Sequence, residues 1–296
     1  MDELNHRLGT AELKLSADSQ IGPYHVQMGY PNQDAYDFIQ GDGFLSLAVA
    51  DGAGSLERSD EGSELAVVAS AGTAADLILR SQRNGTRPDL RQILAEAILE
   101  ARGAVLSLDY WEQAGSTLVL ALLTEDAFAV ATVGDSFAVV QDSAGSLHLV
   151  QPPSVGEFAN ITKLLTSKEF TVSMLTGSLS ELRGLALASD AFEHATLEQR
   201  VPTAGFWKQI FGMARQGKLS VFELIHFMDG QGKIEDDATL IALAAGGEVD
   251  SGEVQTIEEQ EYSLDELLAL SGAEIAEQDP IEEEVSPQRQ GLPTEF

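Results

Sequence analysis

Aspartates recur beside the ends of predicted strands, and their side chains could hold a divalent metal ion. The most distinctive one follows the apolar run 45–50 and starts the turn Asp51-Gly52-Ala53-Gly54. This pattern places a carboxylate at the end of a buried strand, where the backbone turns away. A single aspartate in such a place is more often only a turn residue. Comparable positions are occupied by Asp34, Asp135, Asp190, Asp236 and Asp237.

Carboxylates, together with water and a backbone carbonyl, are the ligands that Mg²⁺ or Mn²⁺ prefers. Two such ions about 3.5–4 Å apart can share a water and lower its pKa, so that the water becomes the nucleophile. The chain has no cysteine, which excludes thiolate nucleophiles, disulfides and zinc–thiolate sites. The aspartate pattern therefore predicts hydrolysis that needs metal and uses no side-chain nucleophile.

Composition limits the partners. The 296 residues are 44% hydrophobic and carry a formal net charge of −31. We expect neither nucleic acid nor an anionic membrane as a partner, because both require a basic face. No apolar run reaches the roughly 18 residues of a membrane-spanning helix, and the N-terminus is acidic where a signal peptide is basic. We expect a cytoplasmic protein.

Hydrophobic periodicity predicts pairs of helices and runs of strands without βαβ alternation, which favours an α+β fold. Residues 1–20 should hold one edge strand, 151–183 a loop-rich excursion, and 116–150 a four-strand antiparallel meander. Helices are expected from 61 to 80, after Pro88, and within 206–228. The remaining predicted strands cover 44–50, 184–188 and 238–244.

The composition changes near Gly247, which divides the chain into a domain, 1–247, and an acidic segment, 248–296. The second segment holds fifteen acidic residues and one basic residue, and we expect most of it to be a disordered tail. Within it, Ser263-Leu264-Asp265-Glu266-Leu267-Leu268 has the spacing of a capping box and a short leucine stripe. This segment is either a helix that docks on a partner or on its own domain, or a transient helix.

Six short motifs follow one another along the chain: Asn32-Gln33-Asp34-Ala35, Val49-Ala50-Asp51-Gly52-Ala53-Gly54, Gly115-Ser116-Thr117, Val133-Gly134-Asp135-Ser136, Ser189-Asp190 and Asp236-Asp237-Ala238-Thr239. In this order, over about residues 20–245, the chain resembles the metal-dependent type 2C protein serine/threonine phosphatases in their compact bacterial form. The resemblance implies a four-layer α-β-β-α sandwich with two central antiparallel sheets, and an enzyme that acts on phosphoserine and phosphothreonine in signalling.

The resemblance also implies roles for single residues. Asp51 would bridge two Mn²⁺ or Mg²⁺ ions, with the carbonyl of Gly52 as a further ligand, and Asp190 and Asp236 would hold the first ion. Asp34 and Gln33 would order metal-bound water, which makes Asp34 and Asp51 the expected catalytic residues. Asp135, together with Asp190, matches the position of a weaker third ion. Asp237 stands where many relatives have asparagine and is expected behind the ligands.

One departure from the family concerns phosphate binding. Relatives carry an arginine a few residues before the first motif, whereas positions 26–30 here read Val-Gln-Met-Gly-Tyr. His25 would either contact a phosphate oxygen or serve as a structural histidine. Loss of a bidentate anion clamp should weaken phosphate affinity more than the hydrolytic step. We therefore expect a weak or unusually selective phosphatase.

The expected partners are a phosphoprotein substrate and a cognate serine/threonine kinase that acts on the same substrates. Two other functions compete with this one. A non-catalytic regulator with a phosphatase fold would bind a phosphoprotein or signal through its acidic tail. A metal-dependent hydrolase of a small phosphoester would share the same aspartates, and the segment that selects the substrate, 151–183, gives no decisive pattern.

Overall fold

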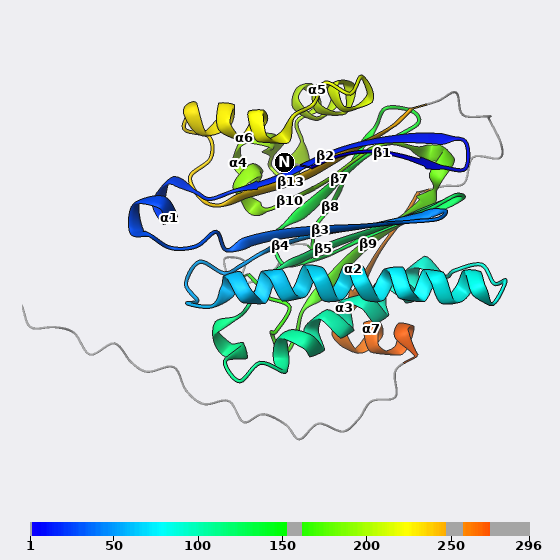
Figure 1. The fold of residues 1–296 in the computed structure, drawn as a ribbon, viewed down its shortest axis with the longest axis horizontal. Helices are drawn as coiled ribbons and strands as arrows, with labels where there is room; N and C mark the ends of the chain where they lie inside the picture. Colours follow the sequence, from blue (N-terminus) through cyan, green and yellow to red (C-terminus); the bar gives the residue numbers. More distant parts are fainter. Residues whose placement is uncertain (1, 153–161, 247–256, 273–296) are drawn as a thin grey trace, which may run out of the picture.

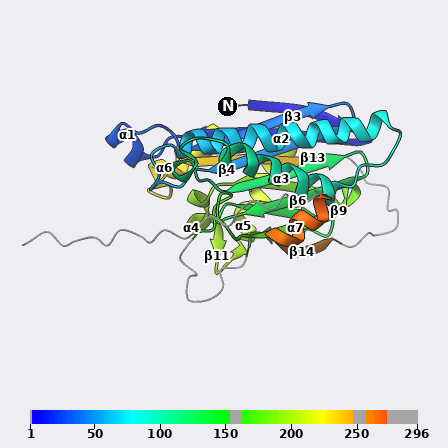
Figure 2. The same ribbon diagram turned by 90° about the horizontal axis from the view of Figure 1, so that it is seen from below.

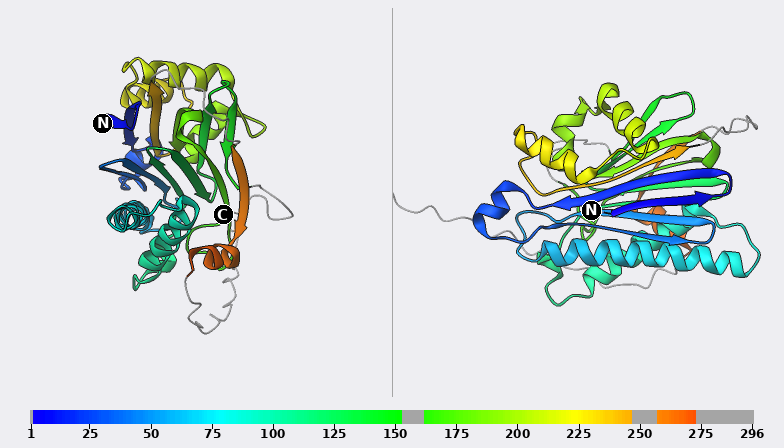
Figure 3. Two further views of the ribbon diagram at one scale, coloured as in Figure 1. Left: turned by 90° about the vertical axis from the view of Figure 1, so that its right-hand side faces the viewer. Right: turned by 45° about the horizontal axis from the view of Figure 1, so that its top comes forward.

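Two antiparallel sheets lie face to face at the centre of the molecule, and helices cover the outer face of each (Figures 1, 2 and 3). The computed structural model describes residues 2–152, 162–246 and 257–272. Over these residues each sheet has six strands, in the orders β1-β2-β13-β10-β7-β8 and β14-β9-β6-β5-β4-β3. The predicted α+β sandwich of four layers is confirmed.

The strands of the sandwich have the following bounds: β1 (Asp2–Leu8), β2 (Ala11–Gln20), β3 (Asp34–Gly41), β4 (Phe44–Asp51), β5 (Leu118–Thr124), β6 (Ala127–Val133), β7 (Phe137–Asp142), β8 (Leu147–Val150), β9 (Thr171–Ser178), β10 (Leu182–Ala188), β13 (Ala238–Gly246) and β14 (Glu258–Ser263). The short β11 (Leu197–Glu198) and β12 (Val201–Pro202) pair separately. The helices are α1 (Pro23–Met28), α2 (Ser59–Arg83), α3 (Leu90–Leu106), α4 (Glu193–Thr196), α5 (Ala204–Arg215), α6 (Val221–Gly230) and α7 (Leu264–Ser271).

The inner strands β4, β5, β6, β10 and β13 read as nearly continuous apolar runs because both of their faces are covered. In β4, Leu45, Leu47 and Val49 point between the two sheets, whereas Ala48 and Ala50 point toward α2 and α3. A third core lies between the other sheet and helices α5 and α6, and Trp207 is fully buried there. Burial on both faces removes the polar alternation of a half-exposed strand.

Helix α2 is the longest helix of the described residues, and its small side chains pack against β3, β4 and α3. Its most apolar 18-residue window has a mean hydropathy of 1.3, which together with its length would suit a membrane span. Half of that window is buried inside the protein. The apolar composition of α2 is thus accounted for by its place in the core.

Three local predictions are wrong. Residues 2–20 form the hairpin β1–β2 instead of one edge strand. The meander over 116–150 is divided between the sheets, since β5 and β6 pair in one sheet and β7 and β8 in the other. The chain crosses at Gly134, whose φ is +93°. All four strands are mainly apolar, so their pattern does not tell which sheet each one joins.

The third error concerns 151–183, which was expected to be loop-rich but contains β9. This strand pairs with β6 on one side and β14 on the other. The serine, threonine and glycine residues of β9 interrupt the apolar pattern. Ser173 is nevertheless buried, between β6 and β14, which are distant from it in the sequence. Pairing with distant strands therefore stabilises a segment whose own pattern is weak.

Part of the expected acidic tail belongs to the folded domain. Residues 257–272 include β14, which adds an edge strand beside β9, and α7, which packs against α3. Leu267 is fully buried and Tyr262 is 8% exposed. The predicted capping box is present, with Ser263 and Glu266 bonding each other's backbone N–H. The expectation of disorder is wrong for these residues, and the rest of the tail lies outside the described residues.

Candidate metal centre

Aspartates from both sheets converge at one end of the sandwich. Asp34 begins β3 and is the register partner of Asp51, the last residue of β4. From the other sheet, Asp190 comes two residues after β10, and Asp236 comes two residues before β13. Helix α1 leads into β3 at this same end of the molecule (Figure 1). The carboxylates that the sequence placed at separate strand ends therefore share one edge.

These carboxylates disfavour one another's charged form. The backbone N–H of Asp190 lies 3.5 Å from Asp51 Oδ2. Burial, reinforced by neighbouring carboxylates, raises the pKa of Asp34 to about 8 and that of Asp190 to about 6. Burial also raises the pKa of Asp51 well above its usual range, and the charges of Asp34, Asp190 and Asp135 add to the effect. A cation between the carboxylates would stabilise their charged forms.

The position of Asp51 is fixed by its backbone. Its N–H donates to Thr117 Oγ1 at 3.0 Å, and its carbonyl accepts the N–H of Thr117 at 2.8 Å. The hydroxyls of Thr117 and Ser136 lie 2.7 Å apart, so the turn after β6 is tied to the same point. At Gly52 a Cβ would lie 2.5 Å from the carbonyl oxygen of Gln33, and only glycine fits this close approach.

Asp34 is buried and keeps one oxygen without a partner. The hydroxyls of Ser189 and Thr239 lie near its carboxylate and partly offset the effect of burial on its pKa. Its Oδ2 and the neighbouring Gln33 Oε1 are buried and have no hydrogen-bond partner. Buried oxygens of this kind are rarely left unsatisfied in proteins. Together with the other carboxylates they fit a hard cation such as Mg²⁺ or Mn²⁺ and its water ligands.

Asp135 lies in the turn between β6 and β7, where Gln151 and Thr162 contact it. The Thr162 hydroxyl donates to its carboxylate, and the side-chain amide of Gln151 donates to its carbonyl. Asp135 also contributes to the raised pKa values of Asp51 and Asp190, so it borders the same cluster. Asp135 therefore lies close enough to Asp51 and Asp190 for its charge to act on both carboxylates.

His25 and Asp237 form a structural contact behind the cluster. Asp237 is 4% exposed and accepts the N–H of Gly22 at Oδ1 and the N–H of Gln33 at Oδ2, each at 2.6 Å. His25, also 4% exposed, places Nδ1 2.8 Å from Asp237 Oδ2. His25, Asp236 and Asp237 have ligand atoms within 4.8 Å of one another, but hydrogen bonds already engage both oxygens of Asp237. The structural role of His25 is therefore supported, and a side chain so buried offers little surface to a phosphate.

The structure thus brings together Asp34, Asp51, Gly52, Asp135, Asp190 and Asp236, all of which the sequence singled out. The hydroxyl residues that hold them were missed as functional residues, although each stands within one of the quoted motifs. They are Thr117, Ser136, Ser189 and Thr239. Helix α1 was also missed. Its signal was Gly22-Pro23, because proline favours the first turn of a helix.

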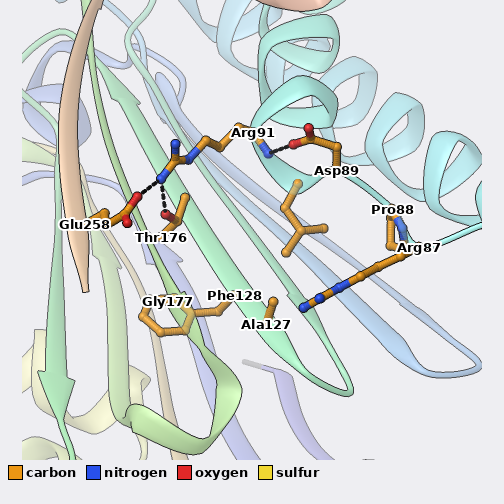
Figure 4. Close-up of a pocket in the computed structure, with 10 residues that line it drawn as sticks. Arg87, Pro88, Asp89, Arg91, Ala127, Phe128, Thr176, Gly177 and Glu258 are labelled. Atoms are coloured by element: carbon orange, nitrogen blue, oxygen red, sulfur yellow. Dashed lines mark hydrogen bonds and ion pairs between the residues drawn. The ribbon is translucent and has the colours of Figure 1, made fainter. Parts of the chain in front are cut away.

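A large open pocket of about 650 Å³ lies elsewhere, beside the start of α3 (Figure 4). The Arg91 guanidinium donates there to Thr176 Oγ1 at 3.1 Å and to Glu258, which lies on β14. Arg87 also lines the pocket and pairs with Asp126 at 2.8 Å. The lining residues include none of the clustered aspartates, so this pocket is separate from the candidate metal centre.

The fold and the aspartate cluster define a class of protein. The chain belongs to the protein phosphatase 2C family, whose sequence model matches residues 21–225. The matched span contains every clustered aspartate except Asp236, which follows it. The resemblance inferred from the motifs is confirmed.

One sequence relative agrees with this assignment, and two solved structures share the fold. The chain is 27% identical over 165 residues to serine/threonine-protein phosphatase 3 of Escherichia coli strain K12, which covers 51% of this chain and 62% of that protein. It therefore spans less than two thirds of that relative. The structure of the Mycobacterium tuberculosis serine/threonine phosphatase PstP/Ppp superposes with a TM-score of 0.55 at 18% identity, over 78% of this chain and 98% of that one. The S. agalactiae serine/threonine phosphatase gives 0.54 at 17% identity, over 78% and 99%.

Proposed function

We propose that this protein hydrolyses phosphoserine and phosphothreonine in proteins, with divalent metal ions as cofactors. The observation that carries the proposal is the convergence of Asp34, Asp51, Asp190 and Asp236 from two sheets at one edge. The family match supports it, as do the phosphatase names of the relatives.

Each aspartate has a role in this proposal. Asp51 and the carbonyl of Gly52 would hold two Mn²⁺ or Mg²⁺ ions, with Asp190 and Asp236 as further ligands of the first and Asp135 at a third ion. When bound, the ions would lower the pKa of a water and neutralise phosphate charge. Since the metal site is made of carboxylates, any phosphate must approach it with those ions in place.

The chain itself would orient the reactants. Asp34 Oδ2 is buried and has no protein partner, so it is the acceptor that would align the attacking water. The contacts of Thr117 with both backbone groups of Asp51 hold that carboxylate in place before substrate arrives. Preorganised polar groups of this kind need no rearrangement during the reaction, which lowers its barrier.

The test is hydrolysis of p-nitrophenyl phosphate and of a phosphothreonine peptide, with Mn²⁺, with Mg²⁺ and with chelator. Asp51→Ala should abolish metal-dependent turnover and leave the fold intact. Asp42→Ala is the matched control, because Asp42 lies in the turn between β3 and β4, at their opposite ends. Wild-type activity in the Asp51→Ala variant would contradict the assignment. Turnover of the small ester alone would favour a small-molecule phosphoesterase.

A folded wild-type protein that binds Mn²⁺ without turning over either substrate would favour the regulator. If turnover is found, the proposed counterpart is a serine/threonine kinase that phosphorylates the same proteins.

A further inference from the structure

Apolar side chains gather on α1 and its flanks, although the segment is on the surface. Over the described residues, five of the nine exposed large hydrophobic side chains lie between positions 21 and 30. We call them the α1 patch. Its members, with exposed fractions from 38% to 61%, are Ile21, Tyr24, Val26, Met28 and Tyr30. Helix α1 projects from one end of the sandwich (Figures 1 and 2).

Both ends of this segment are attached to the candidate metal centre. At Gly22 a Cβ would lie 2.3 Å from the carbonyl carbon of Asp236, so the backbone directly abuts that aspartate. Gly22 and Gln33 both donate their N–H groups to the carboxylate of Asp237. Gln33 is followed at once by Asp34, the first residue of β3. The α1 segment therefore begins and ends beside aspartates of the candidate metal centre.

The segment is held in a defined shape. The rings of Tyr24, His25 and Tyr30 contact one another, with centroids 5.8 to 6.4 Å apart. The N–H of Tyr30 donates to the carbonyl of His25 at 3.0 Å, and Gly29 ends the helix with a φ of +72°. His25 is in turn fixed by Asp237. The apolar side chains are thus carried on an ordered support, which lowers the entropy lost when they bind a ligand.

The charge of the segment points to the kind of ligand. Residues 21–33 contain no aspartate, glutamate, lysine or arginine, in a chain with a net charge of −31. An anionic phosphorylated segment is repelled by an acidic protein, and this segment offers no arginine to offset the repulsion. Apolar contacts do not depend on charge and can supply affinity in its place.

We propose that the α1 patch binds apolar and aromatic side chains that flank the phosphorylated residue of a protein substrate. This inference rests on the proposed phosphatase function and narrows its substrate class. Contacts with residues outside the phosphate would let the enzyme select proteins with hydrophobic flanking residues. Selectivity would then come from the substrate protein rather than from a clamp on the phosphate.

The test compares two phosphothreonine peptides of equal length and charge, one with leucine and phenylalanine beside the phosphothreonine and one with serine and glycine. The wild type should favour the apolar peptide by about tenfold in kcat/KM, mostly through KM. In Val26→Ser/Met28→Ser the ratio between the peptides should fall close to one. Val68→Ser is the matched control, because Val68 is 52% exposed on α2, and it should keep the wild-type ratio.

Hydrolysis of p-nitrophenyl phosphate by the wild type separates the two levels of the proposal. Metal-dependent turnover of this ester with equal kcat/KM for both peptides would overturn the role of the patch and leave the phosphatase function standing. No metal-dependent turnover of any substrate would overturn both. Full peptide preference in Val26→Ser/Met28→Ser would also overturn the inference. The inference would also be overturned if sedimentation showed that the wild type is a dimer and this variant is a monomer. The α1 patch would then bind a second copy of the chain.

Discussion

Asp236 and Asp237 are adjacent in the sequence, yet the structure gives them opposite surroundings, and this difference can be measured. Asp237 is 4% exposed and accepts two backbone N–H groups at 2.6 Å, whereas Asp236 is exposed. Removing the Asp237 carboxylate leaves the N–H groups of Gly22 and Gln33 and the ring of His25 without their partner. Removing the Asp236 carboxylate breaks no such contact and relieves the repulsion between the Asp236 and Asp190 carboxylates.

The size of the effect follows from those contacts. A hydrogen bond to a charged group contributes about 1.5–3 kcal/mol, and a buried donor left without its partner costs about 1–3 kcal/mol. Asp237→Ala should therefore lower the free energy of unfolding by about 3–5 kcal/mol, a large share of the roughly 5–15 kcal/mol of a typical domain. Asp236→Ala, at an exposed position, should change it by less than about 1 kcal/mol in the absence of metal.

Urea unfolding in chelator, followed by circular dichroism, measures the free energy of unfolding of both variants. Titration with Mn²⁺ then tests Asp236 as a metal ligand. Asp236→Ala should lose the stabilisation that Mn²⁺ gives to the wild type, while it keeps the metal-free stability. Equal losses of stability in the two variants would refute the division of roles. A wild-type response of Asp236→Ala to Mn²⁺ would remove Asp236 from the proposed ligands.

Three further predictions concern other parts of the chain. Gly52→Ala should destabilise the fold by about 2–4 kcal/mol in urea unfolding, because the new Cβ would lie 2.5 and 2.7 Å from two backbone oxygens. Gly54→Ala is the control and should cost less than about 1 kcal/mol, because its Cβ would lie 3.7 Å from the nearest atom. Leu267→Ala should cost about 2–4 kcal/mol because the side chain is fully buried, and a smaller loss is expected for the half-buried Leu268→Ala; equal losses would show that α7 is not docked as described. In chelator the stability should fall as the pH rises from about 4 to 8, by up to about 1.4 kcal/mol per pH unit, because folded Asp34, with a pKa of about 8, keeps a proton that the unfolded chain has released. Urea unfolding across this pH range checks that slope, which Asp34→Asn should reduce; an unchanged slope would mean that Asp34 is not the group responsible.

Much of the local structure could be predicted from the sequence, because periodicity reports burial. The helical stripe after Pro88 and the apolar runs of β4, β6 and β13 lie where the pattern placed them. The capping box at Ser263 was also predicted, since it depends on residues only three positions apart. The pairing of β14 with β9 could not be predicted in this way, because it joins segments some ninety residues apart whose charged and polar side chains carry no strand signal.

The sequence by itself determined which side chains are available for the chemistry: aspartates beside strand ends, with no cysteine to compete with them. Only the tertiary structure decided that four strand termini meet at a common edge. They are the start of β3 and the end of β4 in one sheet, and the end of β10 and the start of β13 in the other sheet. It also decided that Asp237 supports the α1 segment from behind while Asp236 stays exposed. The physical reason is that burial and charge repulsion depend on neighbours in space, and the fold alone brings those neighbours together.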